Sequence, residues 1–297
     1  CFPTLDRAAR EAGGCMPQVR MVLQPLTLAD RDGQTLLVSA DAAIHTFYEL
    51  SDDELDLLLR RVVFASREAQ APSADEPLGA HPVLAAQGLT GPFATALRQA
   101  LLDHCGDRNL VRVTFMTSES FGDTWRFGGF DLQNGALVPM QVATLESADQ
   151  VFLNLDLEGQ VFDAGAASPA ATVSDDISLF FDSDFATQTG PAATAMAYQS
   201  LLRIEDPRRY RPDTLDCVSC HVAPAARRWA DVALTLAGPF EEYLDESSAR
   251  VPGATVERTD ELRAFGYFED RPGISQRTAN ETHAVIRYLE AERGITR

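Results

Sequence analysis

The chain has 297 residues, of which 45% are hydrophobic, and its 25 Lys and Arg against 44 Asp and Glu give a net charge of −19. This composition predicts a folded protein with a sizeable core and excludes a disordered or fibrous chain. The negative charge opposes binding to the phosphate backbone of nucleic acid and to anionic lipid headgroups. Because no run of 18 apolar residues occurs, the sequence predicts no transmembrane helix.

The first part of the chain predicts a strand followed by two helices. Residues 35–50, TLLVSADAAIHTFYEL, are typical of a short strand. The run SDDELDLLLRRVVFA predicts a helix that begins at Ser51, with Ser51 and Glu54 forming a capping box. A loop rich in Pro, Ala and Gly is expected from about 71 to 91, and Pro92 opens the second predicted helix.

From residue 109 to 163 the hydrophobic period changes to two, which predicts an antiparallel sheet. Asn134-Gly135 is a strong signal for a hairpin, and Glu158-Gly159 is a weaker signal for a second one. We expect the two earlier helices to cover one face of this sheet. Small and acidic residues from 164 to 190 predict a domain boundary or a long surface connection.

Helical patterns return from residue 191 and include 226–244, 259–268 and 278–294. The expected fold class is therefore α+β. We expect an N-terminal antiparallel sheet with helices in residues 1–190, in a domain whose role the sequence does not assign. Residues 191–297 are expected to form a second, mainly α-helical domain.

One motif stands out in the segment DTLDCVSCHVAP. Cys217, Cys220 and His221 form the single C-x-x-C-H run of the chain. On a helix this spacing places the three side chains on one side of a turn. Both thiols can then add to the vinyl groups of one porphyrin while the imidazole reaches its iron. We expect Asp213 or Thr214 to cap this short helix.

Three other interpretations of the motif are weaker. A structural zinc site needs four ligands, and the remaining cysteines at positions 1, 15 and 105 supply no second C-x-x-C pair. A thioredoxin-like redox pair is expected at a strand-to-helix junction, whereas this pair lies in a helical region. A plain disulfide would give the adjacent histidine no role. The motif therefore favours a covalent haem.

With this motif, and with a last helix whose sequence is ETHAVIRYLEAE, residues 191–297 resemble a class I c-type cytochrome domain. The resemblance implies one haem c, bound through thioether bonds to Cys217 and Cys220. It also implies that His221 is the proximal ligand of the iron. The chain would then be a monohaem electron-transfer protein rather than an enzyme.

The second axial ligand departs from the family pattern, because a class I cytochrome usually places a ligating Met downstream and no Met follows Met196. His283 would give a bis-histidine haem of low potential, whereas Met196 would raise the potential. An open position on the iron is the third alternative. His45, His81 and His104 are expected to lie in the other domain.

Charged and aromatic residues around the motif are candidates for the haem surroundings. Guanidinium groups could pair with propionates or with an acidic partner, and aromatic rings could wall the haem. Equally, these residues could be solvated arginines and ordinary core aromatics. The candidates are Arg227, Arg228 and Trp229 after the motif, Arg203, Arg208, Arg209 and Arg211 before it, and Phe265, Tyr267 and Phe268 further along.

The other cysteines predict an oxidising compartment. Cys1 resembles the lipidated first residue of a bacterial lipoprotein, and Cys15 and Cys105 remain as one candidate disulfide. These features imply a lipid-anchored protein of the bacterial periplasm or outer surface, with redox partner proteins in a larger membrane complex. A basic partner suits the acidic chain. A haem enzyme or sensor of peroxide or a diatomic gas, and a structural subunit of a membrane assembly, remain as alternatives.

Overall fold

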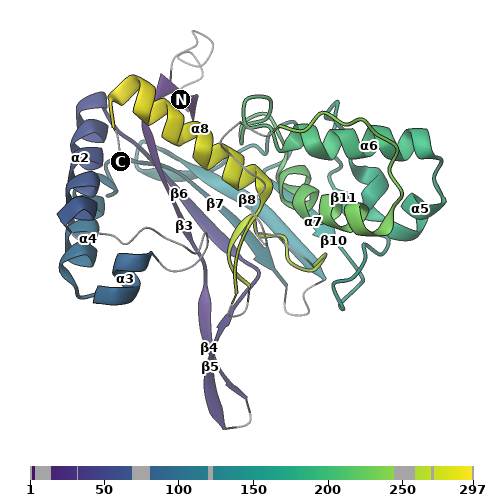
Figure 1. Ribbon diagram of the computed structural model, residues 1–297, viewed down its shortest axis with the longest axis horizontal. Coiled ribbons are helices and arrows are strands. Elements are labelled where there is room, and N and C mark those ends of the chain that lie inside the picture. Colours follow the sequence, from purple (N-terminus) through teal and green to yellow (C-terminus); the bar gives the residue numbers. More distant parts are fainter. Residues whose placement is uncertain are drawn as a thin grey trace.

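The computed structural model describes residues 2–3, 15–31, 33–68, 81–119, 123–243, 258–268 and 271–295. Its centre is a seven-stranded antiparallel sheet in the order β11-β10-β8-β7-β6-β3, with β9 paired beside β8 (Figure 1). The strands are β3 (Gln18–Leu23), β6 (Ala43–Glu49), β7 (Leu110–Ser118), β8 (Thr124–Gln133), β9 (Ala136–Pro139), β10 (Asp149–Leu153) and β11 (Ala166–Ser168). The predicted antiparallel sheet is confirmed, and β3 and β6 extend it.

Three short hairpins complete the strands. They pair β1 (Phe2–Pro3) with β2 (Cys15–Met16), β4 (Leu26–Arg31) with β5 (Gln34–Ser39), and β12 (Phe265–Phe268) with β13 (Arg271–Ile274). The β4-β5 hairpin projects away from the sheet (Figure 1). The predicted strand in residues 35–50 is thus two strands, β5 and β6, that belong to different sheets.

The two predicted hairpins have different outcomes. Asn134-Gly135 is confirmed as a hairpin turn, because β8 and β9 pair across it and both residues have positive φ, 52° and 79°. The hairpin at Glu158-Gly159 was wrong, because β10 pairs with β8 and with β11 instead. The carboxylate of Asp156 accepts three backbone N–H groups of the following residues, and this loop structure replaces a strand ladder.

Three helices follow β6, namely α2 (Asp52–Glu68), α3 (Pro82–Gln87) and α4 (Pro92–His104). The capping box is confirmed, since the Glu54 backbone N–H donates to Ser51 Oγ at 3.2 Å and the Ser51 N–H donates to Glu54 Oε2 at 2.9 Å. Leu55, Leu58 and Ala100 pack α2 against α4. The pair stands beside the β3 edge of the sheet (Figure 1).

The helix that packs on the sheet at β8 and β10 is α7 (Cys217–Ala233), so the expected cover by α2 and α4 was wrong. Val218, Val222, Ala226 and Ala230 are all buried and repeat every four residues along α7. This stripe is the apolar face that the helix turns toward the sheet.

Residues 191–297 are not mainly α-helical, which corrects the predicted fold class. Besides α6 (Pro191–Ile204), α7 and α8 (Gln276–Arg293), their described part contains the β12-β13 hairpin and irregular segments. Two further short helices, η1 (Ser178–Phe181) and α5 (Ser183–Gln188), lie between β11 and α6. Residues 259–268 were predicted to be helical, but they end in β12. Gly266 adopts φ 134°, a conformation outside the helical region.

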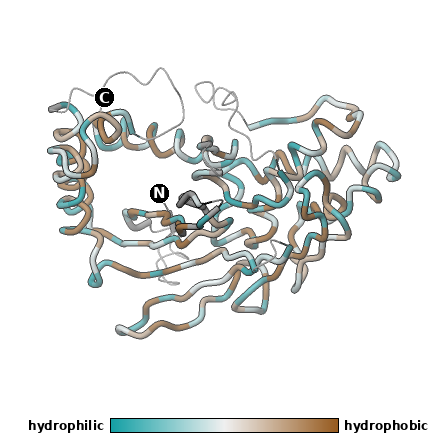
Figure 2. The backbone as a smooth tube through the Cα atoms, turned by 90° about the horizontal axis from the view of Figure 1, so that it is seen from below, coloured by the Kyte–Doolittle hydropathy of each residue, from teal (hydrophilic) through white to brown (hydrophobic). Residues whose placement is uncertain are grey.

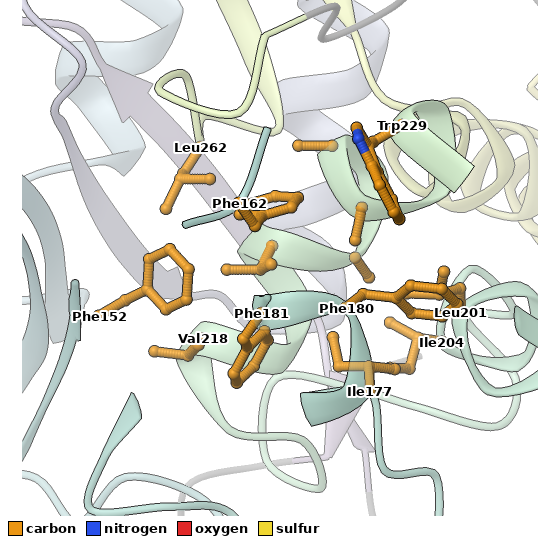
Figure 3. Close-up of a cluster of buried hydrophobic side chains, with 14 of the residues drawn as sticks. Phe152, Phe162, Ile177, Phe180, Phe181, Leu201, Ile204, Val218, Trp229 and Leu262 are labelled. Carbon is orange, nitrogen blue, oxygen red and sulfur yellow. The ribbon is translucent and has the colours of Figure 1, made fainter. Parts of the chain in front are cut away.

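One large core joins the two halves of the chain. Phe152 of β10, Phe162, and Phe180 of η1 lie against Leu201 of α6 and Val218 of α7 (Figure 3). Helices α6 and α7 complete their buried surface with aromatic residues of the sheet and its connections, because two helices enclose little volume alone. The division at residue 190 stays a prediction, although this core lies on both sides of it.

Helix α8 leads back toward the N-terminal helices (Figure 1). Glu281 of α8 lies 3.5 Å from Arg20 of β3, and Arg293 pairs with Asp52 and, at 3.0 Å, with Asp56 of α2. Figure 2 shows α2 and α4 at one end and the α5 to α7 region at the other, with the strands running between them. In the described part of the chain, we find no helix with the length and apolar character needed to cross a membrane.

Candidate functional site

The motif lies at the start of α7, where Cys217, Cys220 and His221 are each half-buried. Both cysteines are free thiols that pack against the rim of the main core. Burial raises the pKa of the Cys217 thiol to about 12, with nearby Cys220 and Asp216 adding to the shift. A reactive thioredoxin-like pair needs a lowered thiol pKa, so the raised value argues against that interpretation.

The first turn of α7 is capped by the buried Asp216, so neither Asp213 nor Thr214 is the cap. The Oδ2 atom of Asp216 accepts a backbone N–H of the first turn at 3.0 Å and the Nε2–H of Gln150 at 2.9 Å. Gln150, on β10, accepts the Val218 N–H at 2.9 Å. This network fixes the start of the helix, and with it the motif, to the sheet.

The ring of His221 is oriented by a backbone carbonyl. Nδ1 of His221 lies 2.8 Å from the carbonyl oxygen of Leu262. Because a carbonyl only accepts, this bond places the proton of the neutral imidazole on Nδ1 and leaves the lone pair on Nε2 for a metal. Burial lowers the pKa of His221, which favours that neutral form. Phe127 of β8 lies beside the ring, with centroids 5.2 Å apart.

His45 of β6, which the sequence interpretation placed in the other domain, is a neighbour of His221. The ring centroids of His45 and His221 are 6.4 Å apart, and the ring planes differ by 21°. Burial, together with the nearby His221 and Arg20, lowers the pKa of His45 to about 4. The signal was in the alternation AIHTFYE, because His45 shares a strand face with Ala43 and Phe47, which are both buried.

Helix α8 places charged side chains beside the motif. Arg277 donates to the carbonyl oxygens of Ile204 and, at 2.9 Å, of Tyr210. Burial raises the pKa of the Cys220 thiol, and Arg277 opposes that rise through its positive charge. A cavity of about 710 Å³ opens between α2, α8 and the 207–212 loop, and Arg277 forms part of its wall.

The two predicted distal ligands lie on α6 and α8, and among the described residues no ring contact joins His283 to His221, so His283 stays a prediction. Met196 of α6 is 72% exposed and points to solvent. His283 is half-buried on α8, but Arg277, Glu281 and Ala284 form the side of that helix next to the cavity. The ring neighbours of His221 are instead those of the sheet.

Of the predicted haem surroundings after the motif, Arg227 and Trp229 have protein partners of their own, and the role of all three residues beside a haem stays a prediction. Arg227 is buried and pairs with Glu205, with Glu242 at 3.5 Å and with Asp231. It lies about 9 Å along the helix axis from His221. Trp229 packs in the main core, edge-on to Phe180. Arg228 is exposed to solvent.

The remaining arginine and aromatic candidates form ion pairs with carboxylates, line the cavity or lie partly exposed at the surface. Arg203 and Arg209 both pair with Asp175, which is buried. Arg208 pairs with Asp206, while Arg211 lies on the wall of the cavity. Phe265 and Tyr267 are partly exposed on β12, and the side chain of Phe268 lies outside the described residues.

The predictions for the other cysteines stay predictions. Cys1, the expected site of lipidation, lies outside the described residues. Cys105 is a half-buried free thiol at the end of α4, and burial raises its pKa. The side chain of Cys15 lies outside the described residues, so its pairing with Cys105 stays a prediction.

Comparisons of the chain with protein-family models, with curated proteins and with solved structures find no match. Among the described side chains, no group of three or more His, Cys, Asp and Glu is gathered to hold a bare metal ion. A haem iron needs only one or two protein ligands, because the porphyrin supplies the other four. Two thiols with a carbonyl-oriented imidazole therefore fit a covalent haem.

Proposed function

We propose that the chain is a monohaem c-type electron-transfer protein, with thioether bonds to the haem at Cys217 and Cys220 and with His221 as the proximal iron ligand. The observation that carries the proposal is the bond between Nδ1 of His221 and the Leu262 carbonyl, next to two free thiols on α7. This bond prepares Nε2 for iron on the same side of the helix as the thiols.

The chain's residues would hold and orient the group. The Asp216 and Gln150 network keeps the first turn of α7 in place, so that the thiols and the imidazole are arranged before any haem binds. The main core closes one side of the motif to water, while the half-buried motif residues leave an edge accessible to a partner. When bound, the haem supplies a one-electron couple at its iron.

The proposal also covers the redox partner and the cellular location. A net charge of −19 favours a redox partner with a basic docking surface. The resemblance to c-type cytochromes adds a place in the bacterial periplasm or on the outer surface, within a larger redox complex. The contact between His221 and His45 favours electron transfer over the alternative of an open iron position, because a second imidazole lies close to the first.

Haem attachment tests the proposal. The chain is produced in a bacterium that attaches haem to C-x-x-C-H motifs, and the purified protein is extracted with acidified acetone, which removes only haem that is not covalently bound. We expect the native chain and Cys105→Ala to retain the haem, and the double variant Cys217→Ala, Cys220→Ala to lose it. Complete extraction of haem from the native chain would refute the proposal.

A further inference from the structure

The geometry points to His45 of β6 as the second axial ligand of the iron, opposite His221. This inference rests on the proposed function, because it names a ligand for the same haem. It replaces His283 and Met196, the ligands expected from the sequence. The ligand would come from the N-terminal sheet, and the iron would link β6 to α7.

The distance between the two imidazoles fits a shared metal. Metal–imidazole bonds are about 2 Å long, so two imidazoles on opposite sides of one metal hold their ring centroids about 6 Å apart. The observed separation of His45 and His221 is 6.4 Å, and the ring planes are within 21° of parallel. The two side chains therefore lie at the spacing that a bis-histidine site requires.

The ring nitrogens of His45 have no hydrogen-bond partner among the described residues. Its side chain is half-buried on the strand face that looks toward α7, and across the strands it is paired with Val22 and Thr114. Within the described part of the chain, His45 makes a ring contact with His221 and no hydrogen bond. Neither ring nitrogen of His45 is among the buried polar atoms that lack a partner in the described residues, so both are open to a ligand such as iron.

The rival ligands are placed less well. Met196 is 72% exposed on α6, and Met116 of β7 is 1% exposed and packed in the main core. Met116 pairs with Ala43, so it lies two residue pairs further along the strands than His45, which pairs with Thr114. Of the side chains considered as distal ligands, His45 is the one in ring contact with His221.

The test compares His45 variants with matched controls in the full chain carrying its covalent haem. We expect a low-spin ferric iron in the native protein by electron paramagnetic resonance. His45→Ala should lose that low-spin signal and bind carbon monoxide when reduced, and added imidazole should restore the low-spin signal. His283→Ala and Met196→Ala should keep the native spectrum.

A second variant keeps the test decisive if His45→Ala fails to mature. His45→Met replaces the imidazole by a thioether, which should raise the reduction potential relative to the native protein. An unchanged potential, a high-spin native iron, or a low-spin His45→Ala protein would each overturn the inference while covalent haem at the cysteines leaves the proposed function standing. Absence of covalent haem in the native chain would instead remove both.

Discussion

The buried carboxylate of Asp216 lies outside the motif, but it holds the start of the helix that bears the motif. It accepts a backbone N–H at the start of α7 and the amide of Gln150. Asp216→Ala removes the cap and leaves the buried amide with one bond fewer, so we expect a loss of about 2 kcal/mol in the free energy of unfolding. Urea denaturation followed by circular dichroism measures the loss.

Thr214→Ala is the matched control, because the exposed Thr214 was the alternative cap in the sequence. Among the described residues its hydroxyl bonds to the backbone of Arg211 alone, so its removal should cost well under 1 kcal/mol. Equal losses in the two variants would show that the carboxylate network does not hold the helix start.

Glu261 gives the protein a predictable dependence on pH. Burial raises the pKa of its carboxyl from 4.5 to about 7, and nearby Asp260 and Asp41 add to the rise. The folded state therefore binds this proton more tightly than the unfolded chain, and the stabilisation is complete below pH 4.5 and lost as the pH rises through 7. Glu261 adjoins Leu262, whose carbonyl orients His221.

We expect the free energy of unfolding to fall by roughly 1 kcal/mol from this group between about pH 5 and pH 8, allowing for its partial exposure to solvent. Glu261→Gln keeps the size and removes the titration, so its urea midpoint should change less over the same range. A Glu261→Gln profile parallel to the native one would contradict the prediction.

At the scale of elements, the spacing of β7 and β8 depends on Gly129. A Cβ atom there would lie 2.6 Å from the sulfur of Met140 and 2.6 Å from the carbonyl oxygen of Val113. Gly129→Ala must therefore push the strands or the side chain apart, and we expect a loss of about 2 kcal/mol in the free energy of unfolding. Thr114 pairs with both Gly129 and His45, so the strain would reach the candidate site.

Gly190→Ala provides the control for Gly129→Ala. A Cβ atom at Gly190 meets nothing within 4 Å, and its φ of −64° suits any residue. Thermal or urea denaturation should give nearly native stability for this variant. If both alanine variants unfold at the same midpoint, crowding at Gly129 does not limit the sheet.

The elements that the sequence predicts correctly are those decided by residues a few positions apart. Ser51 with Glu54, and Asn134 with Gly135, complete their hydrogen bonds or turn conformations locally. The second hairpin failed for a local reason too, since Asp156 captures the backbone N–H groups that a strand would have used. Such competition by a side chain is not visible in hydrophobic periodicity.

For the whole molecule, the sequence located only half of the candidate site. The motif identified His221 because its three residues lie close together in the sequence, but His45 comes from a strand far away in the chain. Only the order of strands and the docking of α7 bring the two rings together. The path of α8 is likewise set by residue pairs that are distant in the sequence, such as Arg20 with Glu281. The helix that was expected to close a separate helical domain instead contacts the sheet and α2.

The shared core leads to a prediction about the expected boundary at residue 190. In residues 191–297 alone, Leu201 and Val218 would lose their contacts with Phe152, Phe162 and Phe180 and would face water (Figure 3). Each fully buried side chain of this size is worth about 1.5–3 kcal/mol, and a small domain has no surplus to absorb several such losses.

We therefore expect the isolated 191–297 fragment to melt without a cooperative transition, whereas the full chain melts in one. Circular dichroism at increasing temperature distinguishes the two outcomes, and mixing with the 1–190 fragment should restore cooperativity if the halves complete a single core. A cooperative transition in the isolated fragment, with helicity equal to that of the same residues in the full chain, would establish an independent haem domain. In that case the iron ligand from β6 would join two domains, whereas with a single core it joins two elements that are already packed together.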